Sequence, residues 1–287
     1  MLETNKPVWF ITGCSTGFGR ELAKQLLEND YRVVVTARDV SKIRDLTEIN
    51  QRNALALPLD VTDEQQVNEA VAAAEKHFGR IDVLVNNAGF GYFGAIEESE
   101  ESEVRAMFET NFWGLSNMTR RVLPAMRERR AGFIVNISSI GGLVAFPTVG
   151  FYNATKFAVN GFSEALQKEV APLGIKVVIV CPSGFRTDWA GRSANEAVNT
   201  IADYAETAGA NKASIRGYSG NQPGDPVRAA KAIVKAVESE NPPLRLLLGR
   251  AALKNARLKL EELKADFETW AETSEGADFP LEANAAK

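Results

Sequence analysis

The chain has little of the chemistry that metal centres and disulfide frameworks require. Its 287 residues include only two cysteines, Cys14 and Cys181, and one histidine, His77. Two widely separated cysteines argue against a disulfide framework and indicate a reducing compartment. With one histidine and no metal-ligand spacing we expect no metal site, and a Ser-His-Asp hydrolase is disfavoured. His77 stands just before Gly79, as at the C-terminal end of a helix, where a cation suits the helix dipole.

The sequence also lacks a strong charge bias and long apolar runs. Lys and Arg number 33 against 37 Asp and Glu, which leaves a net charge of −4 and no electrostatic footprint for nucleic acid or an anionic membrane. No stretch approaches the eighteen or so apolar residues of a membrane span, and the run 8–11 is too short for a signal peptide. We therefore predict a cytoplasmic protein that binds neither nucleic acid nor a membrane.

The chain does contain strands that alternate with amphipathic helices. The β-branched runs 33–35 and 177–180 are typical of strands buried on both faces of a parallel sheet. This alternation predicts an α/β fold, a Rossmann-type doubly wound parallel sheet in a single domain spanning 1–287. Strands are expected at 8–11, 32–37, 54–59, 81–85, 133–137, 177–180 and 244–248. Helices are expected after the first strand, from an N-cap at Thr62 to Gly79, and at 102–123, 152–170, 227–238 and 251–270.

Two segments depart from this pattern. Residues 184–225 are rich in Gly, Ser, Asn and Ala, and we interpret them as a lid inserted after the sixth strand, with one short helix at 195–207. The acidic tail, about 271–287, is expected to be loosely held. A further acidic run, 97–103, is interpreted as a solvated helix start.

Apolar side chains gather in loops next to the polar motifs. We interpret those loops as a hydrophobic substrate pocket that the lid aromatics could close, the alternative being packing between loops. The loop residues are Phe90, Tyr92, Phe93, Leu143, Val144 and Phe146, and the lid aromatics are Trp189, Tyr204 and Tyr218.

A glycine-rich turn joins the first strand to the first helix. Gly13, Gly17 and Gly19 are spaced G-x-x-x-G-x-G, which permits a tight turn and close backbone approach to a ligand. A helix that starts there presents N–H groups to a pyrophosphate, so the turn predicts dinucleotide binding. The other residues of this turn are Ser15, Thr16, Phe18 and Cys14, the last interpreted as a small filler rather than a reactive thiol.

The end of the second strand bears on the choice of cofactor. An acid at this position binds a ribose 2′-hydroxyl, whereas an arginine accommodates a 2′-phosphate. Arg38 favours NADP(H), while Asp39, one residue later, leaves NAD(H) open.

Tyr152 and Lys156 stand four residues apart on a predicted helix and therefore share a face. A free phenol titrates near pH ~10, and a neighbouring cation is expected to lower that pKa toward the working range of an acid–base catalyst. With Ser139 thirteen residues upstream and the glycine-rich turn, the pair predicts an oxidoreductase.

Taken in order, the motifs resemble the short-chain dehydrogenase/reductase superfamily over about residues 5–190. They are Gly13/Gly17/Gly19, Asp60-Val61, Asn86-Asn87-Ala88-Gly89, Asn111, Asn136-Ile137-Ser138-Ser139, Tyr152-x-x-x-Lys156 and Pro182-Ser183-Gly184. The glycine spacing resembles the compact branch of that superfamily. Within it, the stretches 9–19 and 184–188 are similar to 17β-hydroxysteroid and retinol dehydrogenases.

The resemblance implies four catalytic residues. Tyr152 would protonate the carbonyl oxygen, while Lys156 would hold the nicotinamide ribose and lower the tyrosine pKa. Ser139 would hydrogen-bond the substrate oxygen, with Ser138 as its rival. Asn111 would hold a water that links Lys156 to solvent, unless it is a buried helix asparagine bonded to backbone.

The resemblance also implies further cofactor contacts. Asp60 and Val61 would contact adenine, and Asn87, Ala88 and Gly89 would line the adenosine side. Pro182 and Gly184 would lie beside the nicotinamide, with Thr187 on its carboxamide. Ser183 departs from the glycine of many relatives and could narrow this pocket or alter the lid hinge.

These inferences predict an NADP(H)-dependent carbonyl reductase that interconverts a ketone or aldehyde and an alcohol on an apolar, aromatic or steroid- or retinoid-like substrate. One alternative is an NAD-dependent dehydrogenase working oxidatively, and a remote one is a catalytically idle nucleotide sensor. The resemblance further implies a homodimer or homotetramer that pairs through the Tyr152 helix and the long helix before it.

Overall fold

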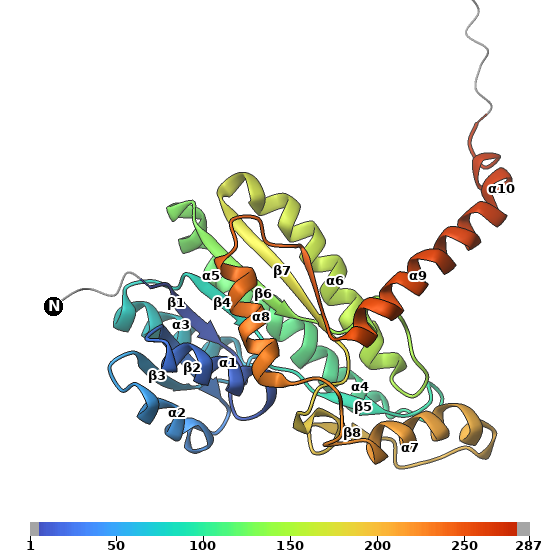
Figure 1. Ribbon diagram of the computed structural model, residues 1–287, viewed down its shortest axis with the longest axis horizontal. Helices are drawn as coiled ribbons and strands as arrows, with labels where there is room; N and C mark the ends of the chain where they lie inside the picture. Colours follow the sequence, from blue (N-terminus) through green and yellow to red (C-terminus); the bar gives the residue numbers. More distant parts are fainter. Residues whose placement is uncertain (1–5, 280–287) are drawn as a thin grey trace, which may run out of the picture.

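A seven-stranded, wholly parallel sheet forms the centre of the molecule (Figure 1). The computed structural model describes residues 6–279. The strand order is β3-β2-β1-β4-β6-β7-β9, so the chain builds outward from β1 to one edge and then from β4 to the other. The strands are β1 Val8–Ile11, β2 Arg32–Ala37, β3 Ala54–Pro58, β4 Val83–Asn86, β6 Gly132–Ile137, β7 Ile175–Pro182 and β9 Arg245–Leu248. The reversal between β1 and β4 leaves a crevice at the carboxyl ends of these strands, which is where such sheets bind ligands.

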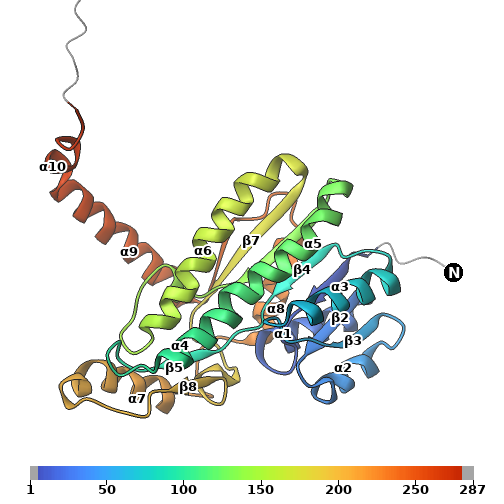
Figure 2. The same ribbon diagram turned by 180° about the vertical axis from the view of Figure 1, so that it is seen from behind.

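Helices cover both faces of the sheet (Figures 1 and 2). On one face lie α1, α2 and α8, and on the other α3, α5 and α6. The α-helices are α1 Gly17–Glu28, α2 Arg44–Ile49, α3 Glu64–Phe78, α4 Glu101–Phe108, α5 Leu115–Arg129, α6 Gly150–Val170, α7 Ala210–Gly217, α8 Pro226–Glu238, α9 Arg250–Thr269 and α10 Ala271–Glu275. Short 3-10 turns are η1 Val40–Ile43, η3 Ile140–Gly142, η4 Ala171–Leu173, η5 Asp188–Ala190 and η6 Ala202–Tyr204, and π-helical segments are η2 Glu109–Gly114 and η7 Ala205–Gly209.

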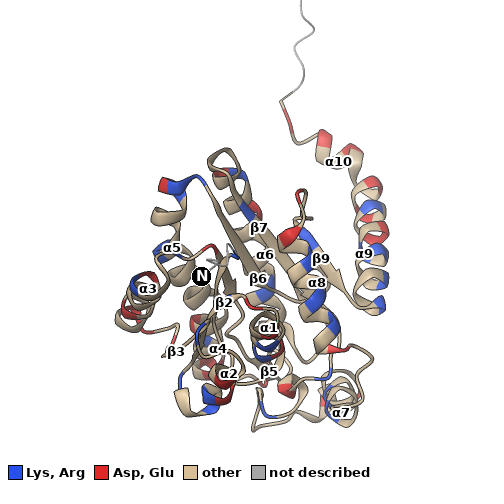
Figure 3. Cartoon of the chain, turned by 60° about the vertical axis from the view of Figure 1, so that its left-hand side comes forward, with Lys and Arg blue, Asp and Glu red and all other residues tan. Residues whose placement is uncertain are grey.

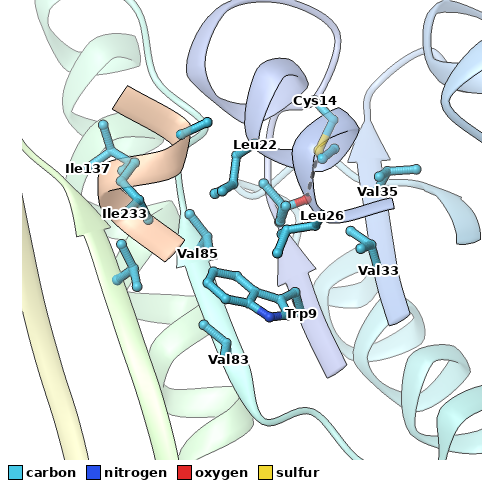
Figure 4. Close-up of a cluster of buried hydrophobic side chains, with 14 of the residues drawn as sticks. Trp9, Cys14, Leu22, Leu26, Val33, Val35, Val83, Val85, Ile137 and Ile233 are labelled. Atoms are coloured by element: carbon cyan, nitrogen blue, oxygen red, sulfur yellow. Dashed lines mark hydrogen bonds between the residues drawn. The ribbon is translucent and has the colours of Figure 1, made fainter. Parts of the chain in front are cut away.

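Successive strand residues point to opposite faces, so the sheet has two apolar cores. Trp9 and Ile11 of β1 face α1 and α8, where Leu22, Leu26 and Ile233 cover them (Figure 4). Phe10, between them, belongs to the core under α3, α5 and α6. Because both sides of β1 are buried, its sequence is continuously apolar rather than alternating.

The predicted fold class is confirmed, and the strand ends differ from prediction by at most two residues. The N-cap of α3 is Asp63 rather than Thr62, because the Asp63 carboxylate accepts from the Gln66 amide, while the Thr62 hydroxyl donates to Asp60. His77 lies in the last turn of α3, which ends at the left-handed Gly79. The helix expected at 102–123 begins at Glu101 and runs on to Arg129, with the π-helical segment η2 in its middle.

The insertion after β7 differs more from the prediction. The short helix expected at 195–207 is wrong, since that stretch contains β8 (Ala194–Glu196), η6 and η7, and the helix α7 begins only at Ala210. β8 pairs in parallel with β5 (Gly91–Phe93), which forms a second, two-stranded sheet. A short segment with a distant partner carries no local pattern, so the sequence does not indicate it.

The C-terminal part leaves the body of the protein along α9 (Figure 1). Part of the tail expected to be loosely held is helical, in α10, and residues 280–287 lie outside the described residues. Between residues 6 and 279 no helix is both long and apolar enough to cross a membrane.

Candidate active site

The glycine-rich turn is shaped to hold an anion at the start of α1. Gly13 and Gly17 have positive φ angles of 71° and 62°, which other residues rarely adopt. A Cβ on Gly19 would collide with the Asn87 side chain and the Gly13 carbonyl. The Thr16 side chain does not cap α1, and its first turn contains no acidic residue. Free N–H groups at a helix start with no carboxylate nearby fit a dinucleotide pyrophosphate.

The Asn87 side chain fastens this turn to the end of β4. Its amide nitrogen donates to the carbonyls of Thr12 and Gly13, at 2.9 and 2.8 Å. The Thr12 hydroxyl accepts from the amides of Asn87 and Ala88, at 2.9 and 3.0 Å. The Asn87 side chain thus shapes the turn, and its predicted place beside the adenosine stays a prediction. Sequence reasoning gave Thr12 no role, although its position directly before Gly13 was a usable signal.

Tyr152 and Lys156 lie together on α6, as their spacing predicted. Both are buried, at 8% and 6% exposure, and the Lys156 ammonium is 5.6 Å from the centre of the Tyr152 ring. The Lys156 Nζ donates to the Ile137 carbonyl at 2.8 Å. The end of β6 therefore fixes the lysine beside the tyrosine.

Burial governs the pKa values of this pair. It raises the Tyr152 pKa to about 12, against a smaller lowering by the Ser139 hydroxyl. Burial lowers the Lys156 pKa to about 8. In the protein alone, desolvation sets the pKa of Tyr152, and the lowering by Lys156 stays a prediction for the cofactor-bound state.

Ser139 follows β6 and lies next to Tyr152. Its hydroxyl accepts from the Gly141 amide at 3.0 Å and caps the turn η3. The rival Ser138 is buried and its hydroxyl contacts the Lys156 carbonyl at 3.4 Å. The structure therefore brings Ser139, rather than Ser138, to the tyrosine hydroxyl.

Asn111 lies in η2, where the helix α4–α5 is π-helical, a distortion often found at functional sites. Its side chain accepts from the Phe90 amide at 3.0 Å and donates to the Phe90 carbonyl at 2.9 Å and to Thr155 at 3.2 Å. The alternative of a buried asparagine bonded to backbone thus describes its side chain. Asn111 fixes the loop after Gly89 against α6.

Of the residues predicted around the adenosine ribose, Asp39 and Asp60 are hydrogen-bonded within their own turns, whereas Arg38 is not. The Asp39 carboxylate accepts from the amide and the hydroxyl of Ser41, at 3.0 and 2.6 Å, and these bonds lower its pKa. Arg38 is exposed, and no hydrogen bond or ion pair to it occurs within residues 6–279. The Asp60 carboxylate accepts from the Thr62 amide and hydroxyl, and Val61 is packed against Gly114.

The segment after β7 turns from the sheet into the lid. The Ser183 side chain faces Gly249 and contacts the Leu248 carbonyl at 3.3 Å, so it does not narrow a nicotinamide pocket as predicted. Gly184 lies beside the Tyr218 hydroxyl, and a Cβ on Gly17 would be 3.6 Å from Thr187. Phe185 packs edge-on against Phe18, with ring centres 5.1 Å apart. The start of the lid thus lies directly over the glycine-rich turn.

The lid covers the tyrosine with an aromatic side chain. The Trp189 ring lies 4.9 Å from the Tyr152 ring and 5.5 Å from the Phe93 ring, centre to centre. These residues belong to an apolar cluster separate from the two sheet cores, and Phe90 and Phe146 pack against it. Of the expected pocket-forming side chains, Phe90, Tyr92, Phe93, Phe146 and Trp189 are therefore together in this cluster, packed on one another. Leu143, Val144, Tyr204 and Tyr218 are not part of it.

The acidic run 97–103 holds the lid by hydrogen bonds at the protein surface. Glu98 accepts from the Ile201 amide at 2.8 Å, and Glu100 accepts from the Val198 amide at 3.0 Å. The Tyr204 hydroxyl donates to Glu97 at 2.7 Å. Glu97 is exposed and Glu98 and Glu100 are only half-buried, as expected of a solvated helix start. The bonds to the lid were not predicted, because their partners lie about a hundred residues away in the sequence.

Cys14 belongs to the glycine-rich turn. Cys14 is fully buried, and burial raises its pKa to about 12, as expected of a filler rather than a reactive thiol.

Arg216 of α7 donates to the carbonyls of Ala190, Gly191 and Ala194 and pairs with Glu196 at 3.0 Å. Sequence reasoning missed this arginine, since no local pattern marks it.

The described residues combine an anion-binding turn, a buried Tyr–Lys pair and a serine at the carboxyl ends of a parallel sheet. The family model "short chain dehydrogenase" matches residues 7–198. The chain belongs to the short-chain dehydrogenases. Two relatives support this assignment over most of its length. An oxidoreductase, BOA17, of Botryotinia fuckeliana is 39% identical, covering 93% of this chain and 97% of the relative. A 3-ketodihydrosphingosine reductase of Bacteroides thetaiotaomicron is 42% identical, covering 83% and 86%.

Solved structures of other short-chain dehydrogenases share the fold. One from Streptomyces avermitilis is 41% identical, with a TM-score of 0.91, and covers 96% of this chain and 100% of its own. One from Burkholderia phymatum, in complex with NAD, is 26% identical with a TM-score of 0.80, covering 93% and 97%. ElxO with bound NADP is 32% identical with a TM-score of 0.71, covering 87% and 99%. The structural neighbours thus bind either cofactor, and this short-chain dehydrogenase is an NAD(P)-binding oxidoreductase.

Proposed function

We propose that this short-chain dehydrogenase is an NADP(H)-dependent carbonyl reductase acting reversibly on a ketone or aldehyde and the corresponding alcohol of an apolar substrate. The observation that carries the proposal is the placement of Tyr152, Lys156 and Ser139 under an apolar lid, beside the anion-binding turn. The name of the Bacteroides relative specifies a 3-keto group, which supports a ketone substrate.

Each side chain has a distinct task in this proposal. The nicotinamide ring, when bound, supplies or accepts the hydride. Tyr152 donates its phenolic proton to the carbonyl oxygen, which the Ser139 hydroxyl holds by a hydrogen bond. Lys156 holds the ribose hydroxyls and restores the proton of Tyr152. Its pKa of about 8 makes the ammonium a ready donor near neutral pH.

Arg38 supports NADP(H) as the preferred cofactor. It is exposed at the carboxyl end of β2 with its guanidinium unpaired among residues 6–279, whereas the Asp39 carboxylate is bonded to Ser41. A free guanidinium suits a 2′-phosphate, and a carboxylate that caps a turn is less available to a 2′-hydroxyl. The alternative, an NAD-dependent dehydrogenase working oxidatively, requires Asp39 to turn away from Ser41.

The lid supports an apolar substrate. Trp189, Phe93 and Phe146 surround Tyr152, so a substrate must displace the Trp189 ring to reach the phenol. An aromatic, steroid-like or retinoid-like ketone replaces that ring with a surface of the same kind. We infer that the lid spans about residues 184–225 and opens for each turnover.

The experiment is a set of initial rates with NADPH and NADH over a panel of apolar ketones. We expect the ratio of kcat/KM for NADPH to that for NADH to exceed ten, and Arg38→Ala to reduce this ratio at least tenfold. Tyr152→Phe should lower kcat by about 10²–10⁴-fold while cofactor binding persists. Similar rates with the two cofactors would refute the role of Arg38. Equal background rates for wild type and Tyr152→Phe would favour the idle sensor.

We further propose that the protein forms a homodimer or homotetramer through α5 and α6. Trp113, at the end of η2, and Phe157, on α6, are large apolar side chains that are 51% and 45% exposed. Burial of such side chains between copies is favourable. Sedimentation of wild type and Phe157→Glu tests this, and an unchanged mass would contradict it. A cytoplasmic location stays a prediction.

A further inference from the structure

Helix α9 extends from the body with almost none of its surface covered (Figures 1 and 2). Of its twenty residues only Ala252 is buried. Leu260, Phe267 and the adjoining Trp270 are 65%, 67% and 64% exposed. A single isolated helix is only marginally stable in water, and its stability normally comes from an apolar face packed on a neighbour. The main neighbours of α9 within residues 6–279 are β9, directly before it, and the short turn η3.

Most of the large apolar residues of α9, together with Ala256 and the adjoining Trp270, form one continuous seam. The seam alternates steps of three and four residues, the repeat of a coiled coil. Its members are Leu253, Ala256, Leu260, Leu263, Phe267 and Trp270. Leu258 is also exposed, at 58%, but lies on the opposite side of the helix.

We propose that α9 pairs antiparallel, along this seam, with α9 of a second copy of the chain. The contact is isologous, so each helix supplies both halves of it. This surface is distinct from the α5 and α6 surface proposed above and does not rest on the proposed function.

The charges of α9 are arranged for an antiparallel partner. Residues 250–259 carry four basic side chains and no acidic one. Residues 261–268 carry four acidic side chains and one lysine. In Figure 3 the basic residues lie at the body end of α9 and acidic ones toward α10. An antiparallel pair places each basic half beside the acidic half of the other copy, whereas a parallel pair opposes like charges.

The sizes of the seam side chains also favour antiparallel pairing of the two α9 helices. With Leu260 opposite Leu263 of the second copy, Ala256 faces Phe267 and Leu253 faces Trp270. Small and large side chains then alternate across the seam, as close packing requires. Parallel pairing would instead place Trp270 against Trp270 and Ala256 against Ala256.

The charges on one flank of the antiparallel pair attract each other, whereas those on the other flank include both repulsion and attraction. On the first flank, Lys259 of each copy lies near Asp266 of the other. On the second, Arg257 and Lys264 approach across the pair, and Glu261, one helical turn from both, offsets their repulsion. The first flank therefore provides a directional test.

A membrane surface is the competing occupant. Phe267 and Trp270 lie in the acidic half of the helix, among Glu261, Glu262, Asp266 and Glu268. Anionic lipid would repel the half that has to insert the aromatic rings. A second copy fits the charge pattern better.

The experiment compares two charge insertions into the same helix of the full-length protein. Leu260→Glu places a carboxylate in the seam, and Leu258→Glu is the matched control on the opposite side. Analytical ultracentrifugation over a range of concentrations should show that Leu260→Glu halves the assembly mass, with the dissociation constant raised at least 30-fold. Leu258→Glu should match wild type.

A charge exchange tests the direction. Asp266→Lys should weaken the assembly at least fivefold, and the double variant Lys259→Asp/Asp266→Lys should restore it. Cofactor binding should stay unchanged in all variants, because α9 lies outside the nucleotide site. Equal masses for wild type and Leu260→Glu, equal losses in both leucine variants, or no restoration by the exchange would overturn the proposal. So would binding of wild type to phosphatidylglycerol vesicles that Leu260→Glu abolishes without a change of mass.

Discussion

The glycine-rich turn and the lid lie against each other over the same crevice, but different kinds of interaction shape them. In the turn the geometry comes from backbone sterics, with Gly13 and Gly17 at positive φ and Gly19 too close to Asn87 to carry a side chain. In the lid the backbone is held by side chains, chiefly Arg216 of the lid itself and the carboxylates of Glu98 and Glu100 from a distant segment.

This difference between turn and lid predicts that substitutions in the two regions affect function differently. A glycine that must remain a glycine leaves no room for adjustment, so the turn should fail sharply when altered. A lid fastened by several hydrogen bonds at a partly solvated surface should loosen by degrees. Cofactor binding and substrate access are therefore expected to respond to different substitutions.

Gly19→Ala should have the largest effect. The added methyl group collides with the Asn87 side chain and the Gly13 carbonyl, so we expect a loss of about 1–3 kcal/mol in stability and a cofactor Kd raised at least tenfold. Gly161→Ala is the control, because a Cβ at that α6 position meets nothing within 4 Å. It should stabilise the protein by up to about 1 kcal/mol. Calorimetry and thermal unfolding measure both, and a Gly19→Ala protein with normal cofactor affinity would contradict the rigid turn.

Lys156→Met should change how stability depends on pH, because this lysine is buried at the end of β6. Its pKa falls from 10.5 to about 8, so below pH 8 the folded protein holds a poorly solvated charge. That cost is relieved as pH rises from 8 to 10.5, where the unfolded chain binds more protons. Wild type should therefore gain up to about 3 kcal/mol relative to Lys156→Met over this range.

Urea unfolding at pH 7, 8, 9 and 10 measures this difference. The raised pKa of Tyr152 acts in the opposite direction, but only above its unfolded value near 10. A constant gap between the two proteins across the series would show that Lys156 is not desolvated.

Arg216→Ala should loosen the lid and leave the turn intact. It removes the hydrogen bonds to Ala190, Gly191 and Ala194, and we expect the lid to lose about 1–3 kcal/mol of local stability. Hydrogen exchange should accelerate in residues 188–217, and KM for the ketone should change several-fold with the cofactor Kd within twofold. Arg192→Ala, which removes an exposed ion pair with Asp188, is the control and should change neither. A matching loss of cofactor affinity in Arg216→Ala would show that the two regions are coupled.

Ser183→Gly should have the smallest effect. The Ser183 side chain points to Gly249 rather than into the crevice, so restoring the glycine common among relatives should leave the cofactor Kd within about twofold. Stability should change by less than about 1 kcal/mol. A cofactor Kd altered more than fivefold would return Ser183 to the nicotinamide pocket.

Features with a local signal were predictable. Continuous apolar runs located the strands, and the spacing of Tyr152 and Lys156 placed both on one face of α6. Thr62 and Asp63 are both good capping residues, so residue type alone could not decide which of them caps α3. The bonds from the 97–103 run to the lid were not predicted, because a carboxylate at a helix start has a sufficient local explanation and its lid partners lie far along the chain.

The sequence by itself determined the layered α/β architecture, the glycine-rich turn and the grouping of the candidate catalytic side chains at the carboxyl ends of the strands. These follow from hydrophobic periodicity, the conformational freedom of glycine and the fixed geometry of parallel strands. Only the tertiary structure decided that the lid is bonded to the acidic run, that Trp189 covers Tyr152, and that burial sets the pKa values of the Tyr–Lys pair. Desolvation and contacts between distant segments exist only once the chain has packed, so no local pattern encodes them.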